Sequence, residues 1–453
     1  MGKSIKEVND DLERSYNGKM SLDPSLSRSL VSFQSNKSRA AYRWYKFKEA
    51  FSAGLVELLL RRYGAQGPLL DPFAGSGTAL FASSSLGLDA EGIELLPLGQ
   101  AIVEARWIAD GIDPDGVRAL SRWAEGSPRE ASGEARPLDE LRITKGAYPG
   151  ETAKEMGRFL ALAKGEDPNV FTLLRFALLC ILETISFTRK DGQYLRWDHR
   201  SPRQRRGKAF DKGLIPSFGE AMRAKLREMV ADMGADPSPS PTKPGKMTLH
   251  HGSCLEVLPR LPAASFGCVL TSPPYCNRYD YTRTYALELA LLGVGDEELG
   301  RLRQAMLSCT VENRAKALLE INSGWKAALD AAEGQELLQA VLLRLDEQKK
   351  KGLLNNASIP RMVRGYFQEM SCVIFECARV LRGGGRLIMV NDNVRYAGTA
   401  ISVDLVLSDV ASRLGFEVEA ILVLPVGKGN SSQQMGIHGR KPLRKCIYIW
   451  RKC

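Results

Sequence analysis

Short apolar runs alternate with amphipathic helical segments in two parts of the chain. In the first part, apolar runs at 68–70 and 90–94 are each followed by helical periodicity, and the first of these helices begins near Thr78. Strands and helices that alternate at this spacing are typical of an open α/β sheet of mostly parallel strands. The second part is expected to add strands at 247–251, 266–271, 386–390, 417–424 and 445–450, and helices at 285–292, 366–381 and 403–414.

Two regions break this alternation, residues 111–246 and residues 296–358, and we interpret both as largely helical insertions. The first encloses a basic segment and ends in a Pro- and Ser-rich linker, whereas the second is rich in Leu, Ala, Glu and Lys. Helices in the first insertion are expected at 153–162, 171–187 and 219–233, and a helix at 46–63 is expected to precede the first strand. The sheet is then assembled from residues 1–110, 247–295 and 359–453.

The composition of the chain indicates which class of partner to expect. The chain has 453 residues and a formal net charge of +11, and a basic surface favours polyanions such as nucleic acid. Nine cysteines occur without a CxxC pair, so we expect reduced thiols and no metal site. The first residues are polar and charged, unlike a signal peptide, and no apolar run is long enough to span a bilayer. These features predict a cytoplasmic protein without membrane contact.

The first strand leads into a glycine-rich turn, DPFAGSGT, from Asp71 to Thr78. Gly75 and Gly77 lack a Cβ, so the backbone can bend sharply and lie close to a ligand. Glu94 closes the second strand, where a carboxylate can accept hydrogen bonds from a ribose diol. Because the turn matches neither GxGxxG nor GxxxxGK[ST], it favours a nucleoside ligand without a pyrophosphate.

A second motif, TSPPY, begins at the end of the strand expected at 266–271. Ligands of an open parallel sheet lie beyond the carboxyl ends of its strands, and this motif lies at such an end. Pro273 and Pro274 fix the local backbone, Ser272 adds a hydroxyl, and Tyr275 offers a flat face on which a base can stack. Acceptors aimed at an exocyclic amine stabilise the positive charge that grows as its nitrogen attacks a methyl group.

With these two motifs, the sequence resembles the S-adenosylmethionine-dependent DNA methyltransferases that modify exocyclic amines. The resemblance implies a Rossmann-like sheet, S-adenosylmethionine as the cofactor, and a catalytic motif formed by Ser272, Pro273, Pro274 and Tyr275. Serine begins this motif most often in enzymes acting on cytosine N4, so the implied reaction is methylation of a flipped cytosine at N4. The implied cofactor contacts are Asp71, Pro72, Phe73, Ala74, Gly75, Gly77, Thr78, Glu94, Ser253 and Cys254.

The resemblance covers residues 37–98 and 247–451, apart from the second insertion, and two positions depart from the family pattern. Ser253 stands where an aspartate often binds the adenine amine of the cofactor, so we expect that contact to be weaker or shared. Gly267 stands where an aspartate often precedes the catalytic strand. The glycine turn, Glu94 and the catalytic motif are intact.

A paired base reaches such a site only when its nucleotide is extruded, so the resemblance implies double-stranded DNA as the partner. The basic segment at 189–213 interleaves cations with aromatic residues, which suits phosphate contacts and stacking, although a solvated charged loop has the same composition. We place target recognition in the first insertion, with Asn277 and Arg278 beside the target base, and the loop at 427–445 is either a DNA contact or an ordinary hairpin. The expected DNA contacts in the basic segment are Arg189, Lys190, Arg200, Arg203 and Arg205.

Three alternatives remain open at this point. An adenine-N6 DNA methyltransferase has the same fold, an RNA guanine-N2 methyltransferase also uses two prolines and an aromatic residue, and a catalytically inactive protein could keep the basic surface. No Pro-Cys dipeptide occurs, which disfavours carbon methylation through a cysteine nucleophile. The remaining expectation is a bacterial or phage-type enzyme at the nucleoid, with a cognate restriction system as a further partner.

Overall fold

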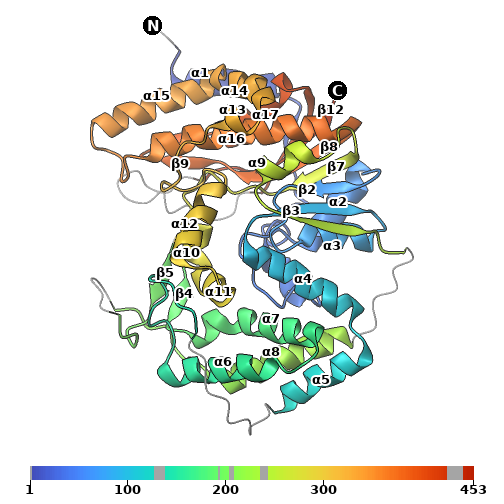
Figure 1. Cartoon of the computed structure of the whole chain (residues 1–453). Helices are drawn as coiled ribbons and strands as arrows, with labels where there is room; N and C mark the ends of the chain where they lie inside the picture. The colour runs from blue at the N-terminus through green and yellow to red at the C-terminus, as the bar shows by residue number, and fades with distance from the viewer. Residues whose placement is uncertain (1–2, 127–137, 192–193, 204–208, 235–242, 426–441) are drawn as a thin grey trace.

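The computed structural model describes residues 3–126, 138–191, 194–203, 209–234, 243–425 and 442–453, and it is built around one eight-stranded sheet (Figure 1). All neighbouring strands in it are parallel except for one strand, β12, which is antiparallel to both of its neighbours. The expected open, mostly parallel α/β sheet is therefore confirmed. In spatial order, the strands are β1 (Met20–Leu22), β11 (Phe416–Val423), β12 (Lys445–Lys452), β8 (Leu381–Asp392), β7 (Phe266–Thr271), β2 (Leu69–Asp71), β3 (Ala90–Glu94) and β6 (Met247–His251).

Successive residues of the central strands point to opposite faces of the sheet and pack against different helices. Leu70 and Val269 lie in a core shared with α16 (Ile359–Val380) and α17 (Val403–Arg413). Leu69 and Leu270 lie in a second core, shared with α2 (Ala53–Tyr63) and α3 (Thr78–Ser85). The central strands are thus apolar on both faces, as strands of a parallel sheet covered by helices on each side should be.

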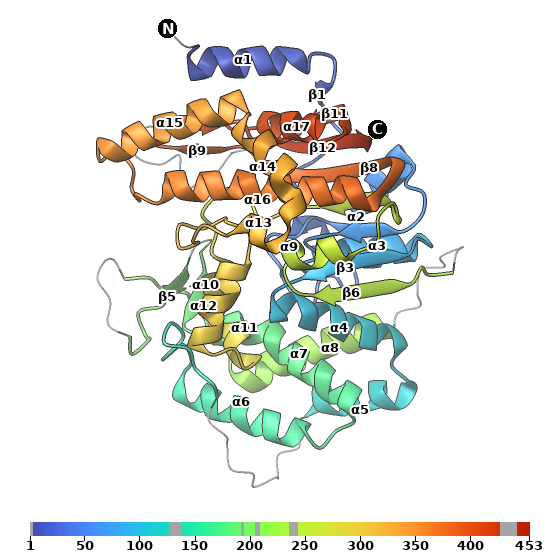
Figure 2. The ribbon, with the colours of Figure 1, turned by 45° about the horizontal axis from the view of Figure 1, so that its top comes forward.

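The first insertion forms a layer of helices on the side of α4 that faces away from the sheet (Figure 2). Its helices share one core with α4 (Pro97–Gly111) and with α11 (Ala286–Leu291), which connects this layer to the sheet domain. The layer comprises α5 (Pro114–Glu125), α6 (Gly150–Ala163), α7 (Pro168–Ile185), α8 (Phe218–Met233) and a short hairpin of β4 (Thr188–Lys190) and β5 (Leu195–Trp197).

Within the described residues, one helix, α7, is long and apolar enough by length and composition to cross a membrane. It packs against α4, α5, α6, α8 and α11. Its apolar side chains, including Leu174, Leu178 and Leu182, are buried in the core of the helical layer. The helix that meets the length and composition criteria for a membrane span is therefore one whose apolar surface is covered by the rest of the protein.

The second insertion is helical, as expected, but it divides between two places. The helix α12 (Asp296–Ala305) packs on α10 (Tyr281–Thr284), between the sheet and the helical layer (Figure 1). The helices α14 (Lys326–Glu333) and α15 (Glu336–Lys350) instead pack on α16, over one face of the sheet. The shorter elements are α1 (Ile5–Ser15), α9 (Cys254–Val257), α13 (Leu318–Ile321), β9 (Val394–Tyr396), β10 (Thr399–Ile401), and the 3-10 turns Phe33–Ser38, Leu258–Arg260 and Ser323–Trp325.

Several local predictions were wrong, each for an identifiable reason. The helix predicted at 46–63 begins only at Ala53, because the Ser52 side chain accepts a hydrogen bond from the Leu55 amide and caps the helix there. The helix predicted at 366–381 begins earlier, at Ile359. The strand predicted at 386–390 begins earlier, at Leu381, so β8 includes the three glycines at 383–385. Helix α5 was missed, although Asp113 followed by proline is an N-terminal signal, and β1 was not predicted either.

Candidate active site

A cavity of about 330 Å³ opens at the carboxyl ends of β2, β3, β7 and β8. The glycine turn and the TSPPY motif both line it, although they lie two hundred residues apart in the sequence. Of the predicted site residues, it brings together Asp71, Pro72, Phe73, Ala74, Gly75, Thr78, Glu94, Ser253, Cys254, Ser272, Pro273, Pro274, Tyr275 and Asn277.

The two motifs are joined by a buried hydrogen bond. Thr271 Oγ1 donates to Asp71 Oδ1 at 2.6 Å, and the same oxygen accepts from the Phe73 amide at 3.0 Å. Burial raises the pKa of Asp71 to about 7, and these two donors only partly offset it. The carboxyl group of Asp71 therefore holds the end of β7 against the turn that follows β2.

Glu94 holds the glycine turn from its other side. Its Oε2 accepts from the Gly75 amide at 2.7 Å, and its Oε1 accepts from the Leu96 amide at 2.6 Å. Burial raises the pKa of Glu94 to about 7. Each oxygen of an ionised carboxylate has a second lone pair, so Glu94 can still accept hydrogen bonds from a ligand in the cavity.

The two glycines of the turn have different roles. Gly75 lines the cavity at φ +54°, and a Cβ on it would lie 3.4 Å from Phe47. Gly77 has φ +72°, but a Cβ there would lie 2.7 Å from Val103 Cγ2 and 3.1 Å from the Phe81 ring. The missing side chain of Gly77 therefore allows close packing behind the turn, whereas that of Gly75 leaves space at the cavity wall.

Next to the carboxyl end of β6, the cavity wall also includes residues 305–307 of the second insertion. The sequence did not indicate that this insertion contributes to the site. Ser253 Oγ donates to the carbonyl oxygen of Ala305 at 3.0 Å, so its hydroxyl is directed to the end of α12. Cys254 is buried, and burial raises the pKa of its thiol well above the usual range. Met306 and Leu307 complete this wall. Their position depends on long-range packing, so no local signal could have found them.

The segment that was expected to be helical, residues 46–51, forms another wall. Phe47 stacks on Tyr285, with ring centroids 5.2 Å apart. Glu49 accepts a hydrogen bond from the Tyr285 hydroxyl, and burial raises the pKa of Glu49. Tyr279 and Tyr281 line the same cavity. An aromatic and acidic wall therefore faces the glycine turn.

The TSPPY motif is embedded in a row of polar contacts. The Ser272 hydroxyl oxygen lies 3.2 Å from the Tyr275 hydroxyl and 3.2 Å from the carbonyl oxygen of Val390 on β8. Lys445 Nζ on β12 lies 3.4 Å from the Tyr275 hydroxyl and 3.5 Å from Asp392 Oδ1. Lys445 and Asp392 both line the cavity, and the sequence analysis did not single out either residue as part of the site.

The residues expected to contact DNA are found in quite different surroundings. Arg189 is exposed, with its guanidinium 5.4 Å from the centre of the Phe210 ring. Lys190 is buried, so our expectation that it contacts DNA is wrong. Its ammonium donates to Glu288 Oε1 at 2.5 Å and to the Tyr45 hydroxyl at 3.0 Å.

Three other arginines that were expected to contact DNA already form hydrogen bonds within the protein. Arg200 binds Asp198 and the carbonyl oxygen of Gly213, and Arg203 donates to the carbonyl oxygen of Ile143 at 2.8 Å. Arg278 lies beyond the catalytic motif, where it donates to Asn355 Oδ1 at 3.0 Å. Arg205 and most of the loop at 427–445 lie outside the described residues.

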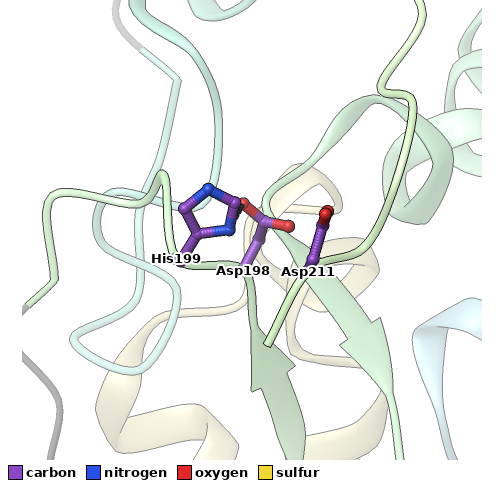
Figure 3. A group of neighbouring side chains, drawn as sticks. All are labelled: Asp198, His199 and Asp211. Atoms are coloured by element: carbon purple, nitrogen blue, oxygen red, sulfur yellow. Dashed lines mark ion pairs between the residues drawn. The ribbon is translucent and has the colours of Figure 1, made fainter. Parts of the chain in front are cut away.

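Asp198, His199 and Asp211 form a group whose ligand-type atoms lie within 4.8 Å of one another (Figure 3). The Asp198 carboxylate already accepts hydrogen bonds from Arg200 Nε at 2.7 Å and from the Lys212 amide at 2.6 Å. The hydrogen bond from Arg200 is the main cause of the strongly lowered pKa of Asp198. Because a guanidinium neutralises its buried carboxylate, we assign this group a structural role.

Comparisons with known proteins agree with this geometry. No family model matches the chain. The type II methyltransferase M.AvaI of Nostoc sp. is 52% identical over 455 residues, which cover 99% of this chain and 94% of that protein, and the protein of the same name from Anabaena variabilis matches equally. The type II methyltransferase M.BsoBI of Geobacillus stearothermophilus is 37% identical over 467 residues, covering 97% of this chain and 91% of that protein. The chain therefore belongs to the type II methyltransferases, DNA methyltransferases that use S-adenosylmethionine as the methyl donor.

Proposed function

We propose that this protein methylates the exocyclic N4 amine of a cytosine that is extruded from double-stranded DNA. The observation that carries the proposal is the shared cavity, which is lined by both the glycine turn and the motif from Ser272 to Tyr275. Serine at the first position of this motif supports cytosine N4 over adenine N6. The residues 111–246 are proposed as the part of the chain that reads the target sequence.

The residues of the cavity fit S-adenosylmethionine. Gly75 leaves room at the wall, and the carboxyl groups of Asp71 and Glu94 line the cavity and hold the turn in place. Glu94 would accept hydrogen bonds from the ribose diol, and the amides at the start of α3 would face the ligand. When bound, the cofactor supplies a methyl group on a positively charged sulfur. We propose that Phe73, Ala74, Thr78 and Cys254 add contacts, and that Ser253 contributes less because its hydroxyl is bonded to Ala305.

The catalytic motif is proposed to act on the target amine. Ser272 Oγ and the carbonyl oxygens near Pro273 and Pro274 would accept hydrogen bonds from the amine, drawing its hydrogens out of the plane of the ring. The nitrogen lone pair then becomes available for attack, and the same oxygens stabilise the positive charge that develops. The methylated nitrogen afterwards loses one of its protons to water, which gives the neutral product. The Tyr275 ring would stack on the base and hold it in line with the methyl group.

DNA contacts are proposed along the first insertion and around the cavity. Arg189 is exposed and free to approach a phosphate, while Arg200, Arg203 and Arg205 would contribute at the same surface. Asn277 lines the cavity and Arg278 follows it, so both are proposed to lie beside the extruded nucleotide. As in restriction–modification systems generally, we propose a partner nuclease with the same target, in the cytoplasm of a bacterium.

The product of the reaction tests the proposal directly. DNA methylated by the purified protein is digested to nucleosides, and the methylated nucleoside is identified by its mass and by comparison with standards. We expect N4-methylcytosine from duplex DNA and no methyl transfer to transfer RNA. N6-methyladenine as the product would instead identify the enzyme as an adenine methyltransferase of the same fold. Labelled methyl transfer to RNA alone would reject DNA as the substrate.

A further inference from the structure

Four polar groups form a row at the cavity, which is lined by three of the residues, Ser272, Tyr275 and Lys445. The two ends of the row are chemically distinct. At one end lies the Lys445 ammonium, 3.4 Å from the Tyr275 hydroxyl, and at the other lies the carbonyl oxygen of Val390, 3.2 Å from Ser272 Oγ. The two hydroxyls between them, those of Ser272 and Tyr275, lie 3.2 Å apart. An ammonium only donates and a carbonyl oxygen only accepts, whereas each hydroxyl has one proton to donate.

These constraints favour one direction for the whole row. Ser272 cannot donate its single proton to both Tyr275 and Val390. The geometry places Ser272 Oγ to donate to either Tyr275 or Val390. If its proton goes to Val390, the contact with Tyr275 remains a hydrogen bond only when Tyr275 donates. The Lys445 ammonium favours that direction, because by donating to the Tyr275 oxygen it makes this hydroxyl a stronger donor. In this arrangement Ser272 Oγ has used its proton and one lone pair, and the second lone pair remains as an acceptor.

The charge state of both residues is consistent with this direction. Burial raises the pKa of the Tyr275 hydroxyl, so it keeps its proton at neutral pH. Burial alone would lower the pKa of the Lys445 ammonium, but Asp392 and Tyr275 outweigh burial, so the pKa is raised and the ammonium keeps its charge. Within the described residues, Asp392 Oδ1 is buried without a hydrogen-bond donor, and the Lys445 ammonium lies 3.5 Å from it.

The strand register explains why these residues meet. Lys445 lies opposite Asp392 where β12 pairs with β8, and Thr271 lies opposite Met389 where β7 pairs with β8. Lys445 Nζ is closer to the Tyr275 hydroxyl, at 3.4 Å, than to the ring centroid, at 5.3 Å. The lysine therefore contacts the hydroxyl end of the tyrosine and does not cover the middle of the ring face that a base would need.

We propose that Lys445, held by Asp392, is a positioning residue that orients the Ser272 hydroxyl as an acceptor for the target amine. This rests on the proposed function only in assigning an exocyclic amine to the cavity, and it applies equally to the amine of cytosine or adenine. Without Lys445, the Ser272 hydroxyl could turn its proton toward Tyr275 or into the cavity. A proton that points into the cavity would face the N–H hydrogens of the target amine, and Ser272 could no longer accept a hydrogen bond from them.

A double-mutant cycle tests the proposal. The rate of methyl transfer in a single turnover, with the enzyme in excess over duplex DNA, is measured for K445M, Tyr275→Phe and the double variant. We expect K445M to lower the rate by about tenfold or more, as removal of one preorganising contact does. Because the effect of Lys445 passes through the Tyr275 hydroxyl, the double variant should be no slower than Tyr275→Phe alone. K445R, which keeps a charged donor, should recover most of the rate.

The controls separate positioning from folding. Lys452 lies near the other end of β12 and donates to the carbonyl oxygen of Leu381, so K452M removes a lysine from the same strand away from the cavity, and its rate should stay within about twofold of wild type. Affinity for S-adenosylhomocysteine, measured by calorimetry, should be unchanged in K445M. If K445M does not fold, a second double-mutant cycle replaces it. That cycle compares Asp392→Asn, Tyr275→Phe and the variant that carries both substitutions.

A K445M rate within twofold of wild type, or effects of K445M and Tyr275→Phe that multiply, would overturn the proposal. The methylated nucleoside made by the wild-type protein is identified in the same experiment. If the product is not N4-methylcytosine, the proposed function is rejected, but the double-mutant cycle can still be interpreted. If the product is N4-methylcytosine and the effects of K445M and Tyr275→Phe multiply, only the role of Lys445 is rejected.

Discussion

Thr271 donates a 2.6 Å hydrogen bond to the buried carboxyl group of Asp71, and this bond connects the catalytic strand to the glycine turn. The two side chains meet because β2 and β7 are neighbouring parallel strands, so both motifs begin at the same edge of the sheet. The contact therefore gives a physical basis for treating the turn and the TSPPY motif as two walls of one cavity, and it suggests a first test.

Thr271→Val keeps the shape of the side chain and removes its donor. The buried Asp71 then has one hydrogen bond fewer, and we expect the free energy of unfolding to fall by about 1–3 kcal/mol, measured by urea denaturation. Cofactor affinity should weaken as well, because the turn is less firmly held. Thr144→Val is the matched control. That threonine donates to the carbonyl oxygen of Leu141 in the first insertion, so its loss should leave cofactor affinity unchanged. An unchanged unfolding curve for Thr271→Val would contradict the assigned role.

Cofactor affinity should depend on pH through Glu94, whose pKa is raised by burial to about 7. Below this pH, the carboxyl group is protonated and has lost acceptor capacity for a ribose diol; above it, the ionised form predominates. We expect affinity, measured by calorimetry, to rise about tenfold between pH 6 and pH 8, as the ionised fraction does. Glu94→Gln should bind more weakly and without this dependence.

Glu91 supplies the control for that measurement. It lies on the same strand, where it is partly exposed and bonded to His250, so Glu91→Gln should retain the pH dependence of the wild type. If the dependence survives in Glu94→Gln, the titrating group is a different one, with Asp71 as the nearest candidate because its pKa is also raised to about 7.

Ser272→Ala and Tyr275→Ala should each reduce the single-turnover rate of methyl transfer by about 10²–10³, whereas cofactor affinity should change little. Both side chains are proposed to contact the base and not the cofactor. Cys276 is the adjacent control, since it is fully buried and has no part in direct attack by an amine, so Cys276→Ala should keep the rate. Loss of activity in that variant without loss of stability would indicate a cysteine-dependent step.

Gly75 and Gly77 should respond differently to the same substitution. Gly77→Ala places a methyl group 2.7 Å from Val103 Cγ2 at a positive φ, so we expect a loss of about 1–3 kcal/mol in the free energy of unfolding, with cofactor affinity of the folded protein retained. Gly75→Ala also strains the backbone, at φ +54°, but its methyl group meets only Phe47 at 3.4 Å, so we expect a smaller loss of stability and weaker cofactor binding. Thermal denaturation and calorimetry on both variants make the comparison. Wild-type stability in Gly77→Ala would show that the packing behind the turn can relax.

Arg189 and Lys190 are neighbours with opposite expected effects. Arg189→Ala should leave stability unchanged and reduce the slope of log affinity for DNA against log salt by about one. Lys190→Met leaves Glu288 buried without its cation, and removing one partner of such a pair costs about 3–5 kcal/mol of stability. Fluorescence anisotropy at several salt concentrations and urea denaturation distinguish the two. A stable Lys190→Met with weakened DNA binding would restore Lys190 as a DNA contact.

The parts of the fold that were predictable are those with strong local signals. The strands ending at Asp71, Glu94 and Thr271 were found because each is a short apolar run followed by a turn, and the same runs located the cavity at their carboxyl ends. The two motifs were found for the same reason, since their glycines and prolines restrict the backbone locally.

The remaining parts depend on contacts between distant residues. Lys445 and Asp392 belong to the site only because β12 pairs with β8 in one particular register. Lys190 reads as a surface cation in the sequence, and only its partner Glu288, 98 residues away, explains its burial. The segment at 46–51 continues the amphipathic pattern of the helix that follows, but that helix is capped at Ser52, and the segment forms a turn that lines the cavity.

The short strand β1 has a consequence for any shortened form of the protein. Met20 to Leu22 pair in parallel with Ile421 to Val423 and cover the outer side of β11. Cleavage after residue 22 would uncover the amide and carbonyl groups of residues 421–423, next to the part of β11 that β1 does not cover. The outer edge of β11 would then be a longer template on which a second molecule can add its own strand. Truncated preparations should therefore self-associate, and a proteolytic nick near this point would convert a well-behaved enzyme into an aggregating one.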